Sequence, residues 1–111
     1  MSESSVRTQV IAQLNDAFRQ TFSGGRCVIT RGVAASPHMA RVCEAVQHYV
    51  FDEVDGNNPY GENDFGTVTI EGETYFWKID YYDRNLEVHS PDPADPAVTQ
   101  RVLTIMCAKE Y

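Results

Sequence analysis

Residues 65–82, FGTVTIEGETYFWKIDYY, decide the fold. Two β-prone runs, 65–70 and 74–82, flank the turn formers at 71–73, and this pattern predicts a tight hairpin. With Glu71 and Gly72 as a two-residue turn, Val68 lies opposite Tyr75. One face, which we expect to pack under helices, then carries Val68, Ile70, Tyr75, Trp77, Ile79 and Tyr81. The other face shows a mixed set, Thr67, Thr69, Thr74, Phe76, Lys78 and Asp80.

Two helices are expected before the hairpin. Apolar residues recur every three or four positions between Ser5 and Phe22, which is typical of an amphipathic helix, and Gly24-Gly25 can end it. Ser36-Pro37 resembles a helix start, and apolar spacing continues from there to about Phe51. These segments predict helices over about 5–22 and 37–51.

Two further strands complete the prediction. Residues 26–33 are β-branched and predict a strand, and residues 102–108 predict a strand that closes the sheet, with a helix from near Pro96 as the alternative. The proline-rich segment 90–96 leads into one expected helical turn at 97–101. The order α-β-α-β-β-β predicts an α+β domain over residues 1–111, with an antiparallel-rich sheet of about four strands and two helices on one face.

The charge of this 111-residue chain is unevenly placed. The net charge is −7, and residues 51–111 carry 13 of the 16 acidic residues but only four of the nine Lys and Arg. Such a chain repels nucleic acid, so we expect no direct nucleic-acid binding and a basic protein as the partner. No apolar run approaches 18 residues and the start is polar, so the prediction is a cytoplasmic protein without membrane contact.

Residues 52–64 predict a long acidic loop. It combines turn formers with the carboxylates of Asp52, Glu53, Asp55, Glu62 and Asp64. With the amides of Asn57, Asn58 and Asn63, these oxygens suit a hard cation such as calcium. The spacing does not match the twelve-residue calcium loop, so the expectation is a solvated loop with no metal.

No catalytic motif is present. His38, His48 and His89 fall in three different elements, and none has metal-ligand spacing to Cys, Asp or Glu. Cys27, Cys43 and Cys107 lie singly in apolar runs, which is typical of buried thiols. The prediction is a protein without enzymatic activity or cofactor. The alternative is a small enzyme or metal-dependent protein that uses the acidic loop with His38 or His89, or Cys27 as a nucleophile.

Three stretches carry a family resemblance: residues 14–25, 58–66 and 76–83, continued by 90–96 and 101–106. They resemble a family of small proteobacterial proteins of unknown function, frequent in alphaproteobacteria and often encoded beside plasmid or integrative-element genes. The resemblance implies a bacterial, mobile-element origin and transfers no catalytic residue.

Two binding hypotheses follow. In the first, a continuous acidic surface docks onto a basic partner, as an inhibitor of a host nucleic-acid-binding defence system would. It comprises Asp52, Glu53, Asp55, Glu62, Asp64, Asp80 and Asp83. In the second, the protein is an accessory subunit that binds through the outward aromatic residues Phe76 and Tyr82.

Overall fold

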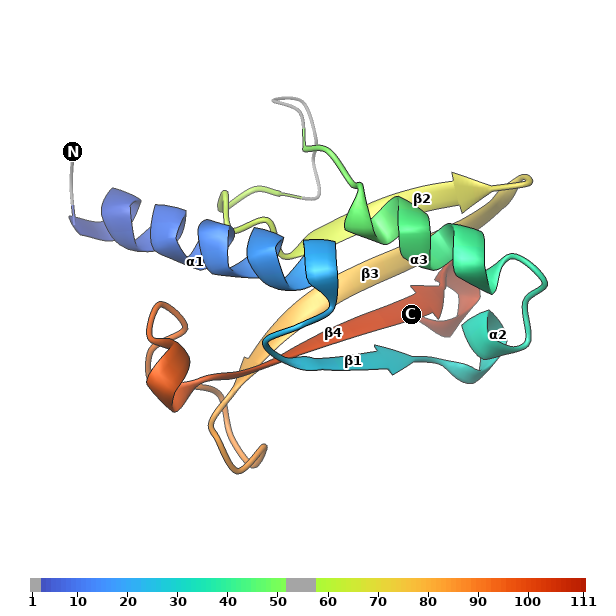
Figure 1. The fold of residues 1–111 in the computed structure, drawn as a ribbon. Coiled ribbons are helices and arrows are strands. Elements are labelled where there is room, and N and C mark those ends of the chain that lie inside the picture. The colour runs from blue at the N-terminus through green and yellow to red at the C-terminus, as the bar shows by residue number, and fades with distance from the viewer. Residues whose placement is uncertain (1–2, 52–57) are drawn as a thin grey trace.

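The computed structural model describes residues 3–51 and 58–111, and Asp52, Glu53 and Asp55 lie outside these residues. It is an α+β fold with helices over one face of a four-stranded sheet (Figure 1). The helices are α1 (Glu3–Thr21), α2 (Arg31–Ala34) and α3 (Met39–Gln47), with 3-10 turns η1 (Pro96–Val98) and η2 (Ala108–Glu110). The strands are β1 (Arg26–Ile29), β2 (Phe65–Ile70), β3 (Glu73–Tyr82) and β4 (Gln100–Cys107).

The sheet is mixed. Its strand order is β1-β4-β3-β2, in which β2 and β4 each pair antiparallel with β3 while β1 pairs parallel with β4. The hairpin has the predicted register, with Ile70 opposite Glu73 and Val68 opposite Tyr75. Glu71 and Gly72 both have positive φ, which is the geometry of a two-residue turn that suits the twist of the strands.

The core lies between the sheet and the pair α1 and α3. The predicted inward face is confirmed, because Tyr75 and Trp77 are fully buried and Val68, Ile79 and Tyr81 are nearly so. From β4, Leu103 and Ile105 join them, and Figure 1 shows both long helices crossing this side of the sheet. Alternation along each strand therefore separates a buried face from one that the long helices leave uncovered, although Met106 on that second face is also buried.

Two boundaries differ from the sequence prediction. The first strand ends at Ile29 instead of residue 33, because the chain turns at Thr30 into α2. The Glu110 carboxylate holds this turn by accepting hydrogen bonds from Thr30 Oγ1 and Gly32 N, at 2.7 and 2.9 Å. The predicted second helix is shorter, since α3 starts at Met39 after a turn in which Ser36 Oγ accepts from His38 N.

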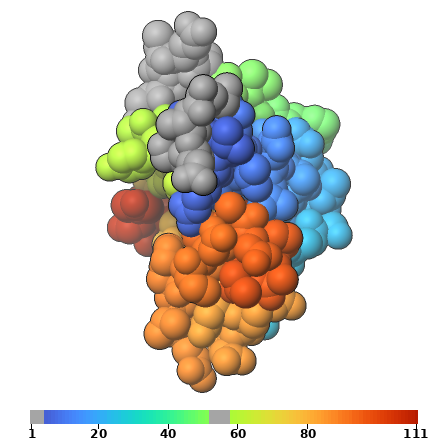
Figure 2. All heavy atoms as spheres, turned by 90° about the vertical axis from the view of Figure 1, so that its left-hand side faces the viewer, coloured from blue at the N-terminus to red at the C-terminus, as the bar shows by residue number. Residues whose placement is uncertain are grey.

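The end of the chain confirms the predicted final strand. Residues 100–107 form β4, and the short turn before it is η1. In Figure 2, the residues that follow β3 (orange) lie against the start of α1 (blue). An ion pair between Arg7 and Asp92, with 2.9 Å between nitrogen and oxygen, joins these two segments. In the described part of the chain, no helix has the length and apolar character needed to cross a membrane.

Candidate functional site

The candidate site is a hollow at the edge of β3, where this strand runs past the start of β2. Asp64 accepts a backbone hydrogen bond from Ile79 at 2.8 Å, and Tyr81 accepts one from Ser90 at 3.0 Å. The hollow has a volume of about 360 Å³. It is lined by Asp64, Ile79, Asp80, Tyr81, Tyr82 and His89, and we call it the acidic hollow.

Carboxylates dominate the charge of the acidic hollow. Partial burial raises the pKa of Asp64, and the nearby charges of Glu62 and Asp80 raise it further. Asp80 also forms an ion pair with Lys78, at 3.1 Å on the half-exposed strand surface. The mutual repulsion of Glu62, Asp64 and Asp80 means that a positive charge placed in the hollow would be stabilised.

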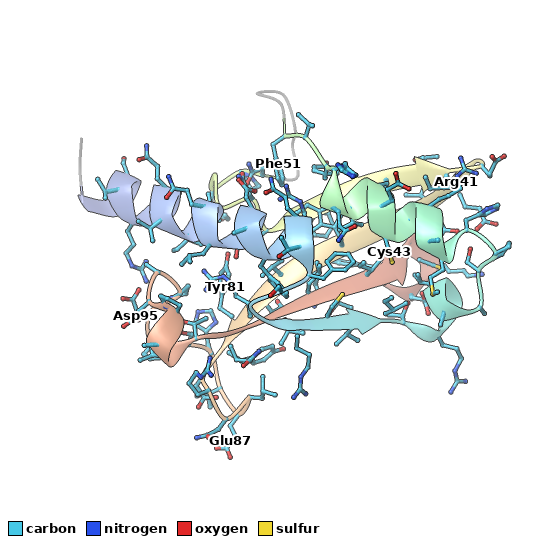
Figure 3. The ribbon with its side chains drawn as sticks, viewed as in Figure 1. Arg41, Cys43, Phe51, Tyr81, Glu87 and Asp95 are labelled. Atoms are coloured by element: carbon cyan, nitrogen blue, oxygen red, sulfur yellow. The ribbon has the colours of Figure 1, made fainter. Side chains whose placement is uncertain are left out.

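A buried polar network supports the floor of the hollow. Tyr81 Oη donates to Glu62 Oε1 at 2.8 Å and accepts from Asn15 Nδ2 at 2.8 Å. Arg101 Nε donates to Asn15 Oδ1 at 2.7 Å, and its guanidinium lies 5.2 Å from the centre of the Tyr81 ring. Burial raises the pKa of Tyr81, which keeps its phenol protonated as a donor. Figure 3 shows Tyr81 between α1 and the sheet.

Helix α1 is also hydrogen-bonded to residues 58–63, which lead into the hollow. Asn58 Nδ2 donates to Asn63 Oδ1 at 2.8 Å, and Asn63 Nδ2 donates to the Asp16 carboxylate at 3.1 Å. Asp16 is itself paired with buried Arg19 at 2.8 Å. The amides of Asn58 and Asn63 therefore hold the loop against α1, which sets the position of Glu62 and Asp64.

The structure brings together some of the predicted site residues and separates others. Asp64, Asp80 and Tyr82 line one hollow, with Glu62 beside it. Asp83 closes the turn after β3 by accepting from Glu87 N at 2.9 Å. Phe76 lies elsewhere on the uncovered face, where it packs on Phe65 and Tyr111. Phe76 and Tyr82 are six residues apart along β3, about 20 Å, and do not form one patch.

The histidines do not converge. His38 and His48 flank α3 at its two ends, and His89 alone borders the acidic hollow. Cys27 lies in β1, at the opposite edge of the sheet from His89, and burial raises the pKa of its thiol. Across residues 3–51 and 58–111, no group of three or more His, Cys, Asp or Glu side chains could hold a metal ion.

Sequence reasoning missed two residues of this region, Asn15 and Arg101, whereas it named His89 beside the acidic loop in the alternative hypothesis, and His89 does border the hollow with Asp64. Asn15 follows buried Ile11 by four residues, so it stands on the apolar stripe of α1 and is fully buried. Arg101 alternates with Leu103 and Ile105, so strand periodicity places it on the core face. A polar residue at a predicted core position is thus a signal by which Asn15 and Arg101 could have been found. Nothing in the sequence, in contrast, predicts the β-bridge between His89 and Tyr82.

The charge on Asp64 should reduce stability. Because its pKa is raised in the folded protein, the folded state takes up its proton at higher pH than the unfolded chain. We expect Asp64→Asn to increase the free energy of unfolding at pH 7, by no more than about 1 kcal/mol because solvent screens this half-exposed site. The advantage of the variant should shrink as the pH falls through the raised pKa. Urea unfolding at pH 7 and pH 4 measures this, and a destabilised variant at pH 7 would contradict it.

A family model described as "Protein of unknown function (DUF3768)" matches residues 7–110. No curated protein matches the chain, and no solved structure does. The predicted membership of a family of unknown function is therefore confirmed, whereas the bacterial and mobile-element origin implied by the resemblance stays a prediction.

Proposed function

The chain belongs to the DUF3768 family of unknown function, and we propose that it is a small binding protein that takes a basic side chain of a partner protein into the acidic hollow. One observation carries the proposal: Asp64 and Asp80 line one hollow together with Tyr82. The charge of Asp64 is disfavoured there, and a bound cation would relieve that cost.

An arginine or lysine side chain suits this chemistry. Carboxylates bind a guanidinium or ammonium group by charge-assisted hydrogen bonds, and the face of a tyrosine ring attracts the same cation. Arg101 already lies over the Tyr81 ring, which is an example of the same cation–π geometry within this protein. Tyr82, the next residue along, is half-buried and borders the hollow.

A protein partner fits better than nucleic acid. The net charge is −7, and the cation beside Asp80, Lys78, is already paired with it. Phosphates would meet repulsion at this surface, since nucleic-acid binding needs clustered Lys and Arg.

The finer form of the proposal concerns the class of partner. Proteins that bind nucleic acid present basic grooves, and an acidic protein that docks into such a groove inhibits them by competition. The resemblance to proteins encoded beside mobile elements supports an inhibitor of a host defence protein of this kind. We expect this protein to displace DNA from such a partner, and the Asp64→Asn variant to need about five- to tenfold higher concentration for the same displacement.

The test uses a nona-arginine peptide and the folded full chain, with amide chemical shifts of Tyr82 and His89 as the readout. We expect Asp64→Asn and Asp80→Asn each to weaken binding five- to tenfold, which corresponds to about 1–1.4 kcal/mol. Lys78→Gln should strengthen binding several-fold, because it removes the internal cation that pairs with Asp80.

Glu44→Gln is the matched control. Glu44 is exposed on α3, so the variant loses the same charge at a distant place and should bind within about twofold of the natural protein. Equal weakening by Glu44→Gln would mean that the peptide senses only the overall charge. The proposal would then be wrong.

A further inference from the structure

A second hollow lies at the opposite end of β3 from the acidic hollow. Its volume is about 560 Å³, within the range of small-molecule sites. It is lined by Gly32, Ala35, Ser36, Pro37, Glu73, Thr74, Cys107, Ala108 and Lys109, and we call it the Lys109 hollow. Thr74 and Tyr82 are eight strand residues apart, so roughly 25 Å separates the two hollows.

One wall of the Lys109 hollow is held rigidly. The Glu110 carboxylate accepts hydrogen bonds from Thr30 Oγ1, Gly32 N and Cys107 N, at 2.7, 2.9 and 2.8 Å. These donors, the Thr30 hydroxyl first among them, lower the pKa of Glu110 to about 2. A Cβ on Gly32 would come within 2.9 Å of both this carboxyl group and Cys107 Sγ, so a larger residue would have to displace one of them. The wall is therefore pre-organised before any ligand arrives.

The polar groups opposite this wall form a chain that ends at Glu73. Tyr75 Oη donates to Glu73 Oε2 at 2.9 Å, and Ser36 Oγ lies 3.1 Å from the same phenol oxygen. Ser36 Oγ also accepts from His38 N at 3.0 Å. Ser36 and Tyr75 thus already have partners, whereas the exposed Glu73 carboxylate has acceptor capacity left for a ligand.

Lys109 supplies a positive charge beside the same hollow. Among residues 3–51 and 58–111, it forms no ion pair. Cys107 lies within electrostatic range of both charges, since Lys109 lowers and Glu73 raises the pKa of its thiol. Burial, first of all, raises the pKa of that thiol, so it stays protonated and is a weak nucleophile. The Cys107 side of the hollow therefore favours non-covalent binding of a ligand over covalent chemistry.

We infer that the Lys109 hollow binds a small zwitterion of the free α-amino acid class, with an apolar side chain. Its ammonium group pairs with Glu73 and its carboxylate with Lys109. The apolar side chain rests on Ala35, Pro37 and Ala108. The site is independent of the acidic hollow and does not rest on the proposed function.

The experiment titrates the full chain with three probes while the amide shifts of Thr74 and Ala108 are followed. L-leucine carries both charges, N-acetyl-leucine lacks the ammonium group, and leucinamide lacks the carboxylate. L-leucine should bind at least fivefold more tightly than either analogue, as expected for the loss of one charged contact. Equal affinities, or no shift at these residues with any probe, would overturn the inference.

Two isosteric variants test which side chain pairs with the ammonium group and which with the carboxylate of the ligand. Glu73→Gln keeps an acceptor for Tyr75 but should abolish the preference for L-leucine over N-acetyl-leucine. Lys109→Gln should abolish the preference over leucinamide. Asp64→Asn, in the acidic hollow, should leave all three affinities unchanged, so failure here and failure of the proposed function are distinguishable. Retained discrimination in both Glu73→Gln and Lys109→Gln would contradict the assignment.

Discussion

Arg101→Met is expected to lower the free energy of unfolding by about 3–4 kcal/mol. Arg101 is only 4% exposed, and its guanidinium donates to Asn15 Oδ1 and to the Pro93 carbonyl and lies over the Tyr81 ring. Methionine fills most of the volume but leaves two buried acceptors without a donor, at about 1–3 kcal/mol each, and removes the cation–π contact. Urea unfolding monitored by circular dichroism measures the loss.

Arg84→Met is the matched control for this prediction. Arg84 is exposed, and its hydrogen bond to the Thr99 carbonyl is 3.2 Å long. Its replacement should cost less than about 1 kcal/mol. Asn15→Leu combined with Arg101→Met should cost at least about 1 kcal/mol less than the sum of the two single changes, because both act on one network. Additive losses would show that the network does not act as a unit.

The hairpin could be predicted in detail because its rules are local. A two-residue turn and strict alternation settle the register of β2 on β3, and burial of Tyr75, Trp77 and Ile79 follows from that register. The amphipathic spacing of α1 is equally local. Where the determinant lies far along the chain, prediction failed. Residues 30–33 leave the strand because Glu110, about 80 residues away, binds Thr30 and Gly32.

The candidate site could be predicted only in part, for the same reason. Asp80 and Tyr82 stand two residues apart on one strand, so alternation alone places them on one face. Asp64 joins them because the hairpin register brings the start of β2 to that edge, which the sequence also implies. The approach of His89 depends on the turn at 83–88, whose geometry rests on Asp83 accepting from backbone amides. The hydrophobic periodicity of the sequence does not predict such a contact.

The parallel pairing of β1 with β4 was beyond local rules as well. The two strands are separated in sequence by α2, α3 and the hairpin, so no short-range pattern specifies their relative direction. One consequence is that β1 ends beside η2, which brings Gly32 and Cys107 to the same wall. The Lys109 hollow is therefore a product of long-range topology, whereas the acidic hollow is largely a product of the hairpin.

Gly66→Ala is expected to lower the free energy of unfolding by about 2 kcal/mol. Gly66 lies opposite Trp77 in the sheet, and an added Cβ would stand 2.7 Å from both Trp77 Cε2 and the Tyr49 ring. Those rings cannot yield easily, since Tyr49, Phe51 and Trp77 contact one another edge to face. Overpacking of this kind costs about 1–3 kcal/mol, and the gain of an alanine over glycine in a strand offsets less than about 1.

The fluorescence of Trp77 gives a direct second measurement of the Gly66→Ala substitution. Trp77 is the single tryptophan, and its buried Nε1 has no hydrogen-bond partner in the described part of the chain. Packing and the Arg19 guanidinium, 5.4 Å from the ring centre, therefore hold the indole. Gly66→Ala should therefore also shift the tryptophan emission of the folded protein. Thr69→Ala, an exposed position in the same strand, should cost less than about 1 kcal/mol and leave the emission unchanged. An unchanged or increased stability of Gly66→Ala would mean that the aromatic cluster adapts to the extra methyl group, and that Gly66 is not needed for close contact with Trp77.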